Sequence, residues 1–63
     1  MYGESYRIIN SHGVVDYAVD RKVAEIKYRR YVLDMLKGYS DFVKLVSVIP
    51  GSLEEILIAS VSK

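Results

Sequence analysis

The segment from Asp20 to Lys37 limits the fold more than any other part of the chain. It contains neither glycine nor proline, and it consists mostly of residues that favour helices. Asp20 suits the N-cap position, because its carboxylate can accept N–H groups of the first turn. Gly38 suits the position just after the helix, where a positive φ is common. The sequence therefore predicts one long helix between these two residues.

Apolar residues recur along this helix at spacings of three and four, which is typical of a face buried against another layer. The predicted inner face consists of Ala24, Tyr28, Tyr31, Val32, Met35 and Leu36. A helix that covers a single sheet needs no other apolar face.

A second stripe nevertheless lies on the opposite side of the same helix. It consists of Val23, Ile26, Arg30, Leu33 and Lys37, with Lys22 and Arg29 as a basic rim. Its steps of three and four resemble the seam of a coiled coil. Two alternatives are that these are ordinary exposed apolar residues, or that the C-terminal segment folds back over them. We predict instead that this outer stripe docks on another chain, most simply a second copy.

Strands are predicted on both sides of the helix. Residues 5–10 and 14–19 are rich in aromatic and β-branched types, and they flank a turn in which Gly13 can adopt a positive φ. This pattern predicts a hairpin. A further strand is predicted over residues 42–49, and the Pro-Gly pair that follows is typical of a type II turn.

Residues 53–62 are open to two interpretations. Their β-branched residues and serines favour a strand, which would place Leu57, Ala59 and Val61 on one face. The Ser-Leu-Glu-Glu run at positions 52–55 instead fits the capping box of a short helix.

We therefore predict a single small α+β domain over residues 1–63. Its architecture is β-hairpin–helix–β-hairpin, with the helix packed on a mostly antiparallel sheet. The alternative, with a helical C-terminal segment, is ββαβα.

The small size of the chain predicts that it needs help to be stable. A chain of 63 residues builds only a marginal core. It has no cysteine for a disulfide, and His12, its only histidine, cannot make a usual structural zinc site with carboxylates alone. We expect no metal and no cofactor, which leaves self-association as the stabilising route.

Chemistry-bearing motifs are absent from the sequence. It contains no glycine-rich phosphate loop and no nucleophile elbow, so we expect a protein that is not an enzyme and has no catalytic residues. It shows no signal peptide and no apolar run long enough for a membrane span, so we expect a cytoplasmic protein without membrane contact.

A basic run in the helix suggests nucleic-acid binding as the alternative function. In that case the protein would be a small nucleic-acid-binding regulator, and Lys22, Arg29, Arg30 and Lys37 would contact the phosphates. The net charge of +1 is lower than is typical of such proteins.

In size and layout, with a glycine-turn hairpin followed by one helix rich in tyrosine and lysine, the chain resembles short accessory proteins of bacteriophages and other mobile elements. The resemblance carries no functional residues with it. It implies a viral protein in the host cytoplasm that inhibits a bacterial defence or regulatory component. The function we expect is thus a homodimeric protein-interaction module, with a host protein as its partner.

Overall fold

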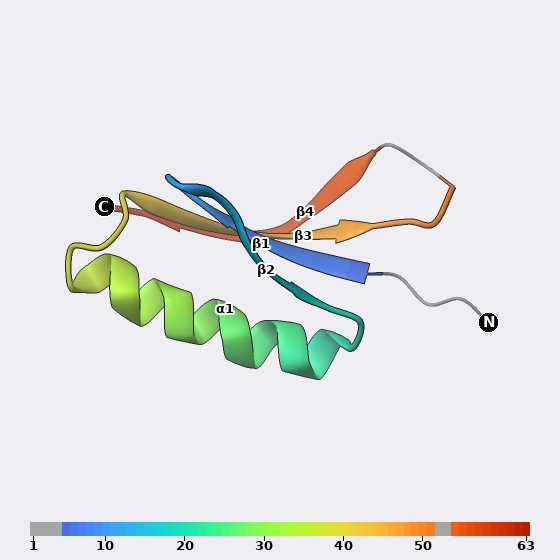
Figure 1. Ribbon diagram of the computed structural model, residues 1–63, viewed down its shortest axis with the longest axis horizontal. Helices are drawn as coiled ribbons and strands as arrows, with labels where there is room; N and C mark the ends of the chain where they lie inside the picture. Colours follow the sequence, from blue (N-terminus) through green and yellow to red (C-terminus); the bar gives the residue numbers. More distant parts are fainter. Residues whose placement is uncertain (1–4, 52–53) are drawn as a thin grey trace.

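The computed structural model describes residues 5–51 and 54–63, and it places one helix against a four-stranded antiparallel sheet (Figure 1). The elements are β1 (Ser5–Asn10), β2 (Gly13–Ala18), α1 (Arg21–Leu36), β3 (Phe42–Val48) and β4 (Glu55–Ser62). The strand order is β2-β1-β3-β4, so pairing of β1 with β3 joins the two hairpins in the middle of the sheet. The predicted hairpin–helix–hairpin domain is confirmed. The ββαβα alternative is wrong because residues 55–62 form a strand, while residues 52 and 53, where the capping box would begin, lie outside the described residues.

Both ends of α1 are fixed by the residues that the sequence indicates. The Asp20 carboxylate accepts the N–H of Lys22 at 2.7 Å, which satisfies a donor that the helix cannot pair internally. At the other end Gly38 has a φ of 98°. The N–H groups of Gly38 and Tyr39 bond back to carbonyls of the last turn, at 2.9 and 3.0 Å. This is the Schellman arrangement, and it turns the chain sharply toward β3.

Replacing Asp20 with alanine should lower the free energy of unfolding by about 1 kcal/mol, because an N-terminal donor of α1 loses its acceptor. Urea denaturation followed by circular dichroism measures the change. Asp20→Asn keeps a side-chain acceptor and is the matched control, so it should cost only a few tenths of that amount. An equal loss in both variants would contradict the capping role.

The core lies between the inner face of α1 and the facing side of β1 and β3. Ile8, Val43 and Leu45 from the sheet meet Ala24 and Met35 from the helix, and all five are buried. Around this centre the partly buried neighbours are Val15, Tyr28, Tyr31, Val32, Ile58, Ala59 and Val61. The helix therefore covers the middle of the sheet.

Leu36 departs from the predicted inner face. Its side chain is 67% exposed, although the helical spacing groups it with the core residues. At about 100° per residue, Leu36 lies on the flank of α1, on the same side as Arg29. Arg29 lines a hollow shared with Val61 of β4, so this flank faces the β4 side of the sheet. Among the described elements, α1 packs chiefly on β3, β1 and β2, so its flank toward β4 is the least covered.

A bulge in β4 also changes which residues share a face. Leu57 lies opposite Val46, Ala59 lies opposite Leu45, and Ile58 is the extra residue between them. Leu45 faces α1 and its neighbour Val46 faces away, so Ala59 and Leu57 lie on opposite faces. The prediction that these two residues share a face is wrong, because an inserted residue reverses the alternation along the strand.

Candidate functional site

The outer stripe of α1 is open to solvent in the single chain. Val23, Ile26 and Leu33 have 43%, 60% and 58% of their surface exposed. The other residues of the predicted contact surface are also exposed, namely Arg30, Lys37, Lys22 and Arg29. Because β4 is a strand of the sheet, the C-terminal segment does not fold back over the stripe, and that alternative is excluded. Docking of the stripe on another chain stays a prediction.

A hollow lies beside the outer stripe, between α1 and β4. It encloses about 430 Å³ and is lined by Tyr28, Arg29, Val32, Leu33 and Val61. Leu33 belongs both to this side hollow and to the outer stripe, so apolar surface continues from the outside of the helix toward β4. The sequence did not indicate the hollow, because it depends on β4 being the strand that α1 covers least.

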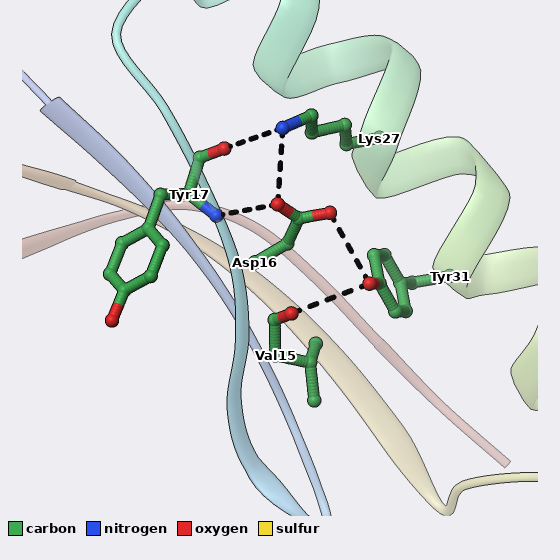
Figure 2. A network of polar contacts seen from close by, with 5 residues as sticks. All are labelled: Val15, Asp16, Tyr17, Lys27 and Tyr31. Carbon is green, nitrogen blue, oxygen red and sulfur yellow. Dashed lines mark hydrogen bonds and ion pairs between the residues drawn. The ribbon is translucent and has the colours of Figure 1, made fainter.

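A network of polar side chains lies at the opposite edge of the sheet, along β2 (Figure 2). The Asp16 carboxylate accepts hydrogen bonds from Lys27 at 3.1 Å, from the Tyr31 hydroxyl at 3.2 Å and from the N–H of Tyr17 at 2.8 Å. Lys27 also donates to the carbonyl of Tyr17 at 2.8 Å. The carbonyl oxygen of Val15 lies 3.4 Å from the Tyr31 hydroxyl and shares its single proton with Asp16. This edge network ties α1 to the outermost strand on its side.

The edge network shifts two pKa values. The hydrogen bond from Lys27 is the main cause of the lowered pKa of Asp16, and the N–H of Tyr17 adds to it. Burial raises the pKa of Tyr31, and the Asp16 charge raises it further. Asp16 is therefore ionised at neutral pH and Lys27 is its partner. The Lys27 ammonium is thus already paired within the edge network.

His12 takes part in joining two loops. Its Nε2 lies 2.9 Å from the carbonyl oxygen of Tyr39, and its backbone N–H donates to Asn10 Oδ1 at 2.8 Å. Nearby, the hydroxyl of Ser11 accepts the N–H of Asp41 at 3.1 Å. These bonds hold the β1–β2 turn against the loop between α1 and β3. Within residues 5–51 and 54–63 no group of three or more histidines and carboxylates is placed to hold a metal ion.

Within the described part of the chain, no helix is both long and apolar enough to cross a membrane. No protein-family model, curated protein or solved structure matches this chain.

Proposed function

We propose that this chain is a small non-enzymatic protein-interaction module of the cytoplasm, which works as a homodimer and binds a partner protein through the outer stripe of α1. One observation carries the proposal. The helix buries one apolar face in the core, and it exposes a second one whose three apolar side chains stay uncovered in the single chain. The layout of the chain supports a host protein as the partner, with the module acting as a phage-type inhibitor of a defence or regulatory component.

The expected energetics suit the centre of an interface. Full burial of a large aliphatic side chain contributes about 1.5–3 kcal/mol, and Val23, Ile26 and Leu33 are about half exposed, so together they supply about 3 kcal/mol before association costs. Interfaces commonly combine such an apolar centre with a polar rim. The basic rim, with Lys22 and Arg29 beside Arg30 and Lys37, favours a partner whose surface is acidic.

The double substitution Ile26→Glu and Leu33→Glu tests the stripe. Both side chains are exposed, so the variant should fold, with an unchanged circular dichroism spectrum and an unfolding midpoint within a few degrees of the wild type. We expect it to lose the host proteins that the immobilised wild type retains from a lysate, as identified by mass spectrometry.

A matched control places two glutamates on the opposite side of the molecule. Val14→Glu with Leu57→Glu alters exposed apolar residues on the sheet face that α1 does not cover, and it should leave capture unchanged. Equal capture by the wild type and the stripe variant would refute the proposed role of the outer stripe.

A further inference from the structure

The two edge strands of the sheet differ in how their free backbone groups are satisfied. An edge strand directs alternate N–H and C=O groups away from the sheet, where they can pair with another strand. At β2, the edge network binds the N–H and C=O of Tyr17 and the C=O of Val15. Figure 2 shows Lys27 reaching the carbonyl of Tyr17 and Tyr31 reaching the carbonyl of Val15 from α1, while Asp16 binds the N–H of Tyr17. The β2 edge is therefore blocked at Val15 and Tyr17 by the protein's own side chains.

The β4 edge lacks such cover. The N–H of Lys63 bonds to the carbonyl of Asp41 at 3.0 Å, toward the β3 side. The backbone N–H and C=O groups of successive residues in a strand point alternately toward and away from the neighbouring strand. Because those of Lys63 point toward β3, those of Ser62 and Ser60 point away from the sheet. Within residues 5–51 and 54–63, no side chain bonds to these outward groups. Residues 56–62 also contain no charge and no proline, so only the bulge at Ile58 protects this edge.

The apolar surface beside β4 is also suited to contact with a strand added at this edge. The side hollow opens between Leu33 of α1 and Val61 of β4, next to the open edge. The exposed side chain of Leu36 adds apolar surface on the same flank of α1. A strand added along β4 would extend the sheet under this flank of the helix and cover surface that β4 alone leaves open.

We infer that β4 pairs antiparallel with β4 of a second copy around a two-fold axis, so that the two sheets become one continuous sheet. The inference rests on the self-association contained in the proposed function, and it names the surface that performs it. The outer stripe then stays free for the partner protein.

The charges at the two ends of β4 favour a second copy in this orientation. β4 begins at Glu55, directly after Glu54, and it is followed by Lys63. The Glu55 carboxylate also accepts a hydrogen bond from Arg7 of β1 at 3.1 Å, so this end of the strand keeps a net charge of −1. Antiparallel pairing brings the acidic end of each β4 near the basic end of the other, on both sides of the axis. Parallel pairing would place acidic end beside acidic end, which is unfavourable. Since the β2 edge is blocked, association closes at two copies and does not continue as a fibre.

Sedimentation equilibrium of the full chain at low micromolar concentration tests this pairing. The wild type should sediment at twice the 7.2 kDa mass of one chain. Ser60→Pro removes an outward N–H and leaves the bonds toward β3 in place, so it should stay folded while its dimer dissociation constant rises at least about tenfold. Ser60→Thr keeps the N–H and is the matched control, with an unchanged dissociation constant.

Amide hydrogen exchange gives a second readout on the unmodified chain. Among the described residues of the isolated chain, the amides of Ser60 and Ser62 have no acceptor, so their protection requires a strand on the outer side of β4. We expect both to exchange at least about tenfold more slowly at dimer-forming concentrations than under dilution to the monomer. This measurement decides the matter even where Ser60→Pro fails to fold.

Three results would overturn the inference, and they separate it from the proposed function. If the wild type stays monomeric, both the β4 pairing and the homodimer are refuted. The role of the outer stripe is still tested separately by the Ile26→Glu, Leu33→Glu variant. If the chain forms a dimer but the Ser60 and Ser62 amides exchange as fast as in the monomer, only the β4 pairing is refuted. Assemblies that keep growing with concentration even in the Ile26→Glu, Leu33→Glu variant remove the closed pair of copies, because they require an associating surface other than the β4 edge and the outer stripe.

Discussion

Replacing Leu45 with alanine should lower the free energy of unfolding by about 3 kcal/mol. Leu45 is 1% exposed, lies opposite Ile8 in the central strand pair and belongs to the core cluster that includes Met35 of the helix. The substitution removes buried apolar surface and leaves a cavity that the tightly packed surroundings refill only in part. A domain of this length has a total stability of roughly 3–9 kcal/mol. Urea denaturation should therefore show a sharply lower midpoint, with part of the protein unfolded at 37 °C.

Leu57→Ala provides the control for this prediction. It is the same chemical change on the neighbouring strand, but Leu57 is 58% exposed and faces away from α1. We expect a loss below about 0.5 kcal/mol. Comparable losses at positions 45 and 57 would mean that the core does not lie between α1 and the sheet.

The course of the chain follows from local signals that need no knowledge of the tertiary structure. Asp20 and Gly38 bound the helix because their side chain and backbone meet requirements of the helix ends themselves. Gly13 has a φ of 106°, which few residues other than glycine adopt, and it marks the first hairpin. Such signals place the helix and the first three strands correctly to within one residue at their ends, whereas for residues 53–62 they favour a strand and leave a helix open.

The sequence pattern does not predict features that depend on packing between helices and strands. Leu36 belongs to the inner stripe by spacing, but its exposure is set by where β4 lies relative to the helix. The bulge at Ile58 has no glycine or other local marker, and it reverses the faces of β4 that simple alternation predicts. One extra residue was enough to misplace Leu57.

The candidate site was anticipated only in part, for the same reason. The outer stripe is a property of one helix, so its periodicity is visible in the sequence. The edge network joins Asp16 of β2 to Lys27 and Tyr31 of α1, and Lys27 in the sequence is simply one base of a basic run. Likewise, the contrast between a blocked β2 edge and an open β4 edge appears only when the strand order is known.

Asp16→Ala should lower the free energy of unfolding by about 2 kcal/mol at neutral pH. The substitution removes the acceptor shared by Lys27, Tyr31 and the N–H of Tyr17, and hydrogen bonds to a charged group are among the more stabilising ones. The expected loss is smaller than for a buried site because the side chain is 29% exposed. Asp41→Ala removes the same charge from an exposed side chain outside the network and should cost less than about 0.5 kcal/mol.

The pH dependence of this loss distinguishes a charged network from simple packing. The pKa of Asp16 in the folded chain lies below its ordinary value of 3.8, chiefly because of the hydrogen bond from Lys27. The unfolded chain therefore binds a proton at a higher pH than the folded chain does, and the stabilisation is complete above pH 3.8 and is lost as the pH falls through the folded value. Denaturation at a series of pH values should show the deficit of Asp16→Ala at full size near neutrality and shrinking in acid. A deficit that keeps its size down to the lowest pH would show that the carboxylate charge contributes nothing to closing the β2 edge.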